Sequence, residues 1–305
     1  MHFLEFIARM EERSTKLLRS ELWARFKHPT VRQIVFSAAF AAFIGGIFLS
    51  IQAEPKLLQN ISLPPALLAL LIFVPAKIFL IIIDFQLTAR LLNKSIRFTS
   101  AAQTIVLASA ANMLPLPGGV MVRASRFKTL GISYKDGLFL SVLVAFLWVG
   151  SAFIYAGACA LFINHLWLGF FLFGAGAPVL FGSAGLIHYL YKNIRYVLSL
   201  IAVRCLITLT EAGRLFFCFA ALHVGADFVH SSILSVAPAV GAMVVIVPSG
   251  LGIIEAVSAL LGGVLDVGAS ASYMASTLSR ILWLIVNLFL GIFVFVAIKV
   301  SKKPT

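Results

Sequence analysis

Residues 66–83 read ALLALLIFVPAKIFLIII, a run of apolar side chains interrupted by one charge, at Lys77. An α-helix rises about 1.5 Å per residue, so roughly 20 apolar residues are enough to cross the ~30 Å hydrocarbon core of a bilayer. Runs of this kind recur along the whole chain, at about 31–51, 64–92, 98–114, 136–164, 166–190, 197–222, 233–263 and 270–298. The pattern predicts an all-α polytopic membrane protein.

The overall composition excludes a soluble enzyme. Of the 305 residues, 61% are hydrophobic and only 11% are charged, whereas soluble domains carry about 25% charged residues. The formal net charge is +13, with Lys and Arg concentrated at the ends and in certain loops. In a membrane protein such residues mark cytoplasmic loops that face anionic lipid head groups, so we expect no nucleic-acid partner.

The chain divides into a basic N-terminal segment, one membrane domain and a short basic tail. Residues 1–30 are amphipathic and basic, which is typical of a helix lying on the cytoplasmic membrane surface. A soluble cap packed on the loops is the alternative for this segment. We expect a single membrane domain over residues 31–300 and a cytoplasmic tail over 301–305.

The distribution of Lys and Arg predicts the topology. The basic segments 1–32, 90–97, 123–135, 192–195 and 299–303 are placed inside, and the segments 52–63, 164–167 and 223–232, poor in Lys and Arg, outside. Both termini are then cytoplasmic. The runs 98–114 and 233–263 must each begin and end on one side, so we expect about six transmembrane helices plus two re-entrant helical hairpins.

Proline and glycine interrupt both of these runs, and we call the two interruptions the first and second breaks. Broken backbone at membrane depth is tolerated only where protein or a water-filled cavity surrounds it. The halves, about 31–164 and 166–298, would then form an inverted repeat with the substrate near their interface. The predicted gate positions are Pro115, Pro117, Gly118 and Gly119 in the first break and Pro248, Gly250 and Gly252 in the second.

Ionisable residues inside the apolar runs are costly, so they usually face a cavity or a partner. Five such residues are basic and three are acidic, which predicts a cationic cavity suited to an anionic group such as phosphate. Two alternatives remain: the charges neutralise one another as structural pairs, or Lys77 and Arg204 lie near the membrane faces and extend into the interface. The eight residues are Lys77, Asp84, Arg123, Arg204, Glu211, Arg214, Glu255 and Arg280.

Spacing adds detail to this set. Lys77 and Asp84 lie seven residues apart and therefore on one helix face, close to Pro75, which is expected to kink that helix. Glu211 and Arg214 are spaced to pair directly. The substrate-binding residues we predict are Arg123, Glu211, Arg214, Glu255, Arg280, Asp84 and Asn112.

Signatures of catalysis and of metal binding are missing from the sequence. The histidines have no metal-ligand spacing, and there is no phosphate loop, HExxH motif or dinucleotide fingerprint. The glycines around Ser183 are better read as small residues that let membrane helices pack closely. We therefore expect no catalytic residue, no metal and no cofactor.

Two motifs flank the breaks. The first comprises Asn112-Met113-Leu114-Pro115, Gly119-Val120-Met121-Val122-Arg123 and Gly131-Ile132-Ser133, and the second comprises Pro248-Ser249-Gly250-Leu251-Gly252-Ile253-Ile254-Glu255 and Arg280. They resemble the lysylphosphatidylglycerol synthase transmembrane region family, also called the flippase-like membrane domain family. The resemblance extends over roughly residues 31–300. The chain departs from the family pattern at Val120, usually acidic, at Ser249, usually Gly, and at Ile254, often Arg.

This resemblance implies a stand-alone lipid flippase of the bacterial cytoplasmic membrane, without the soluble synthase domain. Its substrate would be an anionic amphipathic lipid of the phospholipid, polyprenyl-linked or hopanoid type. A non-transporting subunit or regulator of an envelope-lipid biosynthetic enzyme is the main competing function. An intramembrane enzyme and a neutral-solute or ion transporter also fit the sequence, and the oligomeric state is left open.

Overall fold

The computed structural model describes residues 29–59, 61–112, 118–244 and 247–301, and every element in these ranges is helical. Six helical stretches are long and apolar enough to cross a membrane, which confirms the all-α membrane class. They are α3 (Pro29–Ala53), the continuous stretch α5 (Leu63–Leu68), η1 (Ala69–Phe73) and α6 (Val74–Leu91), then α9 (Tyr134–Phe162), α10 (Leu166–Tyr191), α11 (Ile194–Ala221) and α15 (Ala269–Ser301).

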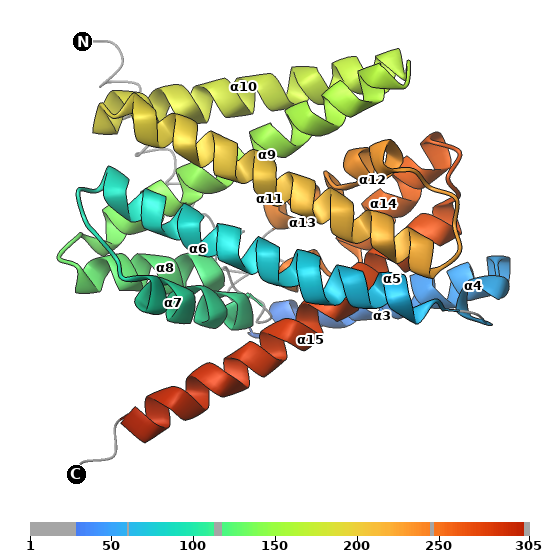
Figure 1. Ribbon diagram of the computed structural model, residues 1–305, viewed down its shortest axis with the longest axis horizontal. Coiled ribbons are helices and arrows are strands. Elements are labelled where there is room, and N and C mark those ends of the chain that lie inside the picture. The colour runs from blue at the N-terminus through green and yellow to red at the C-terminus, as the bar shows by residue number, and fades with distance from the viewer. Residues whose placement is uncertain (1–28, 60, 113–117, 245–246, 302–305) are drawn as a thin grey trace.

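The remaining helices are too short to span a bilayer. The run 98–114 contains one 14-residue helix, α7, and the run 233–263 is divided among α12, α13, η2 and α14. α7 and α8 lie side by side near one end of the long helices, and α12 and α14 lie near the other end (Figure 1). These short elements are α4 (Lys56–Gln59), α7 (Phe98–Ala111), α8 (Gly118–Thr129), α12 (Phe228–Leu234), α13 (Ala237–Met243), η2 (Pro248–Gly250) and α14 (Ile253–Val264).

Local chemistry explains where several helices bend or begin. Proline has no amide hydrogen and its ring clashes with the preceding turn. Residues 69–73, just before Pro75, accordingly form a wider π-helical segment, so the predicted irregularity falls within one turn of that proline. Ser133 caps the start of α9, because its Oγ accepts a hydrogen bond from the Asp136 N–H at 3.1 Å.

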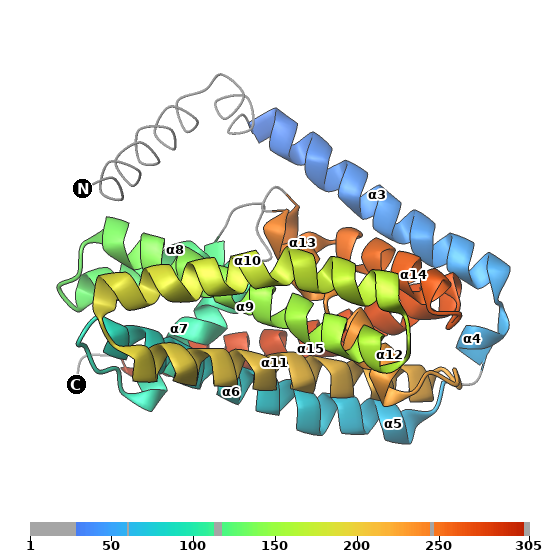
Figure 2. The same cartoon turned by 90° about the horizontal axis from the view of Figure 1, so that it is seen from above.

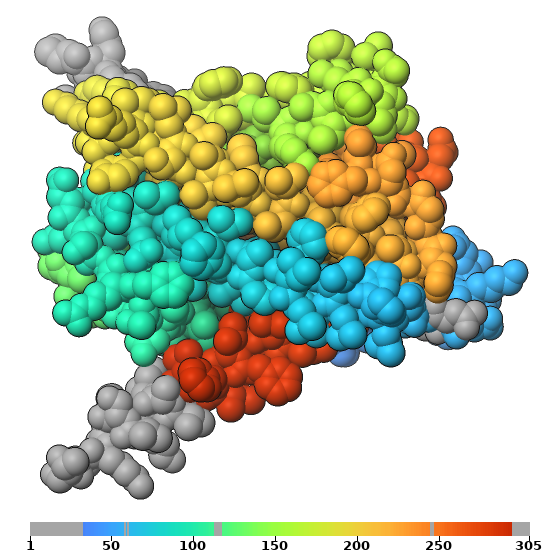
Figure 3. Space-filling model, viewed as in Figure 1, coloured from blue at the N-terminus to red at the C-terminus, as the bar shows by residue number. Residues whose placement is uncertain are grey.

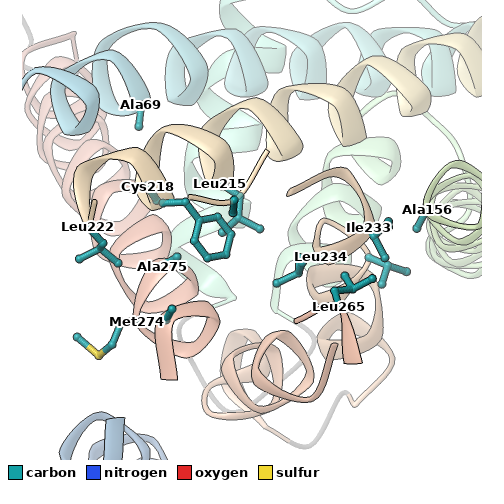
Figure 4. Close-up of a cluster of buried hydrophobic side chains, with 14 of the residues drawn as sticks. Ala69, Ala156, Leu215, Cys218, Leu222, Ile233, Leu234, Leu265, Met274 and Ala275 are labelled. Carbon is teal, nitrogen blue, oxygen red and sulfur yellow. The ribbon is translucent and has the colours of Figure 1, made fainter. Parts of the chain in front are cut away.

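α11 is the helix around which the others pack. It contacts α5, α6, α9, α12 and α15. Its apolar side chains Leu215 and Cys218, and Leu222 directly after the helix, join a buried cluster with side chains from α12 and α15 (Figure 4). α6 and α11 run side by side across the face drawn in Figure 3. This pairing brings the polar side chains of the two helices together.

α3 lies at the periphery. It runs along the outside of the other helices (Figure 2) and contacts mainly α15, with a smaller contact to α14. Its large side chains Ile34, Phe36, Phe40 and Ile44 are exposed, as expected of a helix that faces lipid hydrocarbon.

Three sequence predictions fall outside the described residues. These are the N-terminal interfacial helix, apart from its last two residues, the prolines Pro115 and Pro117 of the first break, and most of the C-terminal tail.

Candidate functional site

A cavity of ≈ 380 Å³ lies among the long helices and between the two breaks. Residues from α6, α7, α8, α9, α11, α12, α13, α14 and α15 line it, together with η2. Two tryptophans, Trp148 and Trp283, and seven serines contribute to the wall. The five basic residues of the predicted set all line this cavity: Lys77, Arg123, Arg204, Arg214 and Arg280.

The first ion pair joins α6 to α11. Arg204 Nε lies 2.6 Å from Asp84 Oδ1, and Arg204 Nη2 donates a hydrogen bond to Asp84 Oδ2 at 2.7 Å. Both side chains are buried, so the two charges compensate each other in a setting of low polarity. Asp84 thus stabilises the α6–α11 contact and, unlike Arg204, does not line the cavity.

The second group shares one carboxylate between two cations. Glu211 accepts hydrogen bonds from Lys77 Nζ and from Arg214 Nη2. Both cations also lie over the ring of Trp283, with Lys77 Nζ 4.7 Å and Arg214 Cζ 5.6 Å from its centroid. The face of an indole attracts cations, so Trp283 helps to hold two like charges beside one anion. Arg214 Nε and Nη1 are buried and have no hydrogen-bond partner in the described residues.

The third group, Arg280 and Glu255, forms hydrogen bonds with the backbone of the second break. Arg280 Nε donates to Glu255 Oε1 at 2.5 Å, and Arg280 Nη1 and Nη2 donate to the carbonyls of Ser249 and Gly250 at 3.1 and 3.2 Å. Glu255 Oε2 in turn accepts from the Gly252 N–H at 2.8 Å and so caps α14. Arg280 and Glu255 therefore satisfy the polar backbone groups that the break leaves without helical partners.

The two breaks touch each other through Asn112. The Asn112 side-chain Oδ1 accepts a hydrogen bond from the Gly119 N–H at 2.8 Å, and its backbone carbonyl accepts from Ser249 Oγ at 2.9 Å. A Cβ atom at Gly119 would lie 2.5 Å from Asn112 Oδ1, so this approach requires glycine. Asn112 and Ser249 both line the cavity, which places this contact in its wall.

Arg123 differs from the other four cations. In the residues that the structure describes it forms no ion pair, and its Nε is buried without a hydrogen-bond partner. The charged groups that act on it most strongly are Asp84 and Arg204, which are already paired with each other. The five cations and Glu211 line the cavity, whereas Asp84 and Glu255 lie behind Arg204 and Arg280. With three carboxylates for five cations, two positive charges of this set are in excess.

The structure brings all eight predicted ionisable residues together. Seven of them form ion pairs, as the structural-pair alternative expects, and Arg123 is the exception. The direct pairing of Glu211 with Arg214 is confirmed. Lys77 and Arg204, for which extension into the interface was the alternative, line the cavity and pair with carboxylates on neighbouring helices.

Not all of the predicted gate residues line the cavity. Gly119, Pro248 and Gly250 line the cavity, Gly118 is buried nearby, and Gly252 lies at the start of α14 with a φ of 77°. Trp148, Trp283 and the serines were not predicted from the sequence as lining residues. Trp283 carried a usable signal, since it lies three residues after Arg280 and so on the same helix face.

The described part of the chain contains no cluster of three or more His, Cys, Asp or Glu residues that could hold a metal ion. The cavity offers cations, hydroxyl groups and indole faces, all of which can contact an anionic or polar ligand. No family model matches the chain, and no curated protein matches it. The resemblance of the two break motifs therefore stays a prediction.

Proposed function

We propose that the protein moves an anionic amphipathic lipid across the membrane, with the head group bound in the charged cavity. The observation that carries this proposal is Arg123, a cation that lines the cavity without an ion-pair partner in the described residues. A charge kept in a membrane-embedded cavity is costly unless something compensates it. An anionic group of the substrate would supply that compensation.

A phosphate or phosphodiester suits the cavity chemically. The forked guanidinium group of arginine matches two oxygens of such an anion. Arg214 adds two buried donor atoms, Nε and Nη1, that no described protein group uses. Serine hydroxyls at Ser276 and Ser279 are available for further hydrogen bonds. These features favour phospholipid, polyprenyl-linked or hopanoid-type lipids with an anionic head.

For the mechanism, we infer that α7–α8 and the segment from α12 to α14 are re-entrant hairpins that enter from opposite faces as parts of an inverted repeat. Three features support this inference: their helices are too short to span, they lie near opposite ends of the long helices (Figure 1), and the breaks meet at Asn112 and Ser249. Opening that contact on one side at a time would expose the head group to alternate leaflets.

The family and the location remain part of the proposal. The break motifs favour the flippase-like membrane domain family, and the basic segments favour a bacterial cytoplasmic membrane with both termini inside.

A second candidate is a non-transporting subunit of an envelope-lipid biosynthetic enzyme. The observation that favours it is that four of the five cavity cations already pair with carboxylates, as they would in a purely structural network. This candidate predicts that the cavity has no preference for anionic lipids.

Native mass spectrometry of the purified protein separates the two candidates. We expect an anionic lipid to remain bound to the wild type and to be lost from Arg123→Gln. Arg126→Gln is the matched control, because Arg126 lies on the same helix but does not line the cavity. Equal amounts of the same lipids on all three proteins would contradict the transport proposal and favour the subunit.

A further inference from the structure

A second hollow of ≈ 440 Å³ lies between α3 and the start of α14. We call it the α3 groove. None of the residues that line it has a polar side chain. On α3 these are Val35, Ala38, Ala39 and Ala42, and on the other wall they are Val247, Leu251, Gly252, Ile253, Ala256 and Val257.

The way α3 is attached explains the groove. The Tyr273 hydroxyl of α15 donates a hydrogen bond to the Phe43 carbonyl at 2.9 Å and fixes α3 at that point. Gly252 touches α3 directly, since a Cβ atom there would lie 3.2 Å from the Ala39 carbonyl oxygen. The α3 side chains beside this contact are mostly alanines, too short to fill the space up to α14, and α3 lies along the outside of the helices (Figure 2).

A thin strip of backbone separates the α3 groove from the charged cavity. Val247 lines both hollows. Within the same strip, residues 248–250 and Ile254 line the cavity, whereas residues 251–253 line the groove. A cationic, hydroxyl-bearing space and an apolar space therefore meet at the second break.

We propose that the α3 groove holds one hydrocarbon chain of the lipid whose head group occupies the cavity. This inference rests on the proposed function and adds the position of one hydrocarbon chain of the lipid. An amphipathic molecule has both parts joined, and the strip at residues 247–254 places a matching environment for each part on its two sides.

The chemistry of the groove fits a hydrocarbon chain. All ten lining residues are apolar, so no side chain in the wall offers a charge or a hydrogen bond to a polar occupant. A hydrocarbon chain is narrow enough to lie along it, and each buried CH₂ group favours binding.

A large side chain introduced into the groove should block the hydrocarbon chain, so lipid binding to such a variant tests the inference. The probes are dioleoyl and dihexanoyl phosphatidylglycerol, which share one anionic head group and differ in chain length. Ala42→Trp places a large side chain in the groove, whereas Ala41→Trp makes the same change at a neighbouring position that lines neither hollow. We expect Ala42→Trp to lower the affinity for the long-chain probe about tenfold. The tryptophan would displace part of the hydrocarbon chain, and the loss of about two buried CH₂ groups has an effect of this size. Binding of the short-chain probe should stay within about twofold, because its head-group contacts are unchanged.

Several outcomes overturn the inference. Equal long-chain affinities for Ala42→Trp and Ala41→Trp would do so, as would equal weakening of both probes or a wild type that binds neither. Ala38→Trp, from the same wall, repeats the test if Ala42→Trp does not fold. Arg123→Gln tests the head-group site separately: if it weakens neither probe, the proposed function fails while the result for Ala42→Trp still decides the groove.

Discussion

The hydroxyl group of Ser249 donates a hydrogen bond to the backbone carbonyl of Asn112 across 2.9 Å, although the two residues are 137 positions apart in the chain. Asn112 follows α7 directly and Ser249 lies in η2, so this bond joins the end of α7 to the second break in the wall of the cavity. Ser249 holds this position with a φ of 49°, a conformation that serine seldom adopts.

We predict that Ser249→Ala opens the cavity wall. The substitution removes the bond to Asn112, which contributes about 1 kcal/mol. A cysteine placed at Ser279, another lining residue, should then react faster with a polar thiol reagent. Ser249→Gly should act in the same direction, since it also lacks the hydroxyl. Unchanged labelling in both variants would show that the contact does not close the cavity. The assay requires a background in which the native cysteines of the described residues are replaced: Cys159, Cys205 and Cys218.

We predict that Asp84 and Arg204 contribute to stability as a unit. Asp84→Leu alone leaves Arg204 buried without its partner and should lower the free energy of unfolding by about 3–5 kcal/mol. The double variant Asp84→Leu/Arg204→Leu should recover much of that loss, because both charges are gone. Thermal unfolding of the purified proteins measures the effect. Strictly additive losses would mean that the ion pair does not stabilise the α6–α11 contact.

We predict that Glu211→Gln makes stability depend on anionic lipid. Without its carboxylate, Lys77 and Arg214 face each other beside Trp283 uncompensated, and the protein should unfold more readily in neutral detergent. Phosphatidylglycerol, whose phosphate takes the place of the carboxylate, should restore the unfolding temperature more than phosphatidylcholine does. If both lipids raise it equally, the cavity does not select an anion at this position.

Much of the helical architecture was predictable because it depends on local composition. The apolar runs 136–164 and 197–222 correspond to α9 and α11 with shifts of at most three residues at either end, since burial of backbone polar groups forces apolar segments into helices. The breaks were predictable for the same reason, because proline and glycine act on the residues next to them.

The pairing of the charges was not predictable from spacing. Lys77 lies seven residues before Asp84 on α6, yet the two side chains bind different partners on α11, Glu211 and Arg204. Which cation remains unpaired depends on how α6, α8 and α11 pack, and one sequence carries no direct signal for that packing. The α3 groove could not be predicted from the sequence either, because its two walls lie about 200 residues apart in the chain and only the packing of the helices brings them together.

Transport of an anionic head group through the cavity, with Arg123 as its uncompensated cation, can be measured directly. The assay is translocation of acyl-labelled phosphatidylglycerol and phosphatidylcholine in vesicles that contain the purified protein, followed by loss of fluorescence to a membrane-impermeant reductant. We predict that wild type and Arg126→Gln translocate phosphatidylglycerol faster than phosphatidylcholine. Arg123→Gln should translocate phosphatidylglycerol about tenfold more slowly or worse, because the loss of one charge-assisted hydrogen bond to the head group weakens its binding by about that factor. Equal rates for wild type and Arg123→Gln, or no preference for the anionic lipid, would contradict the proposed function.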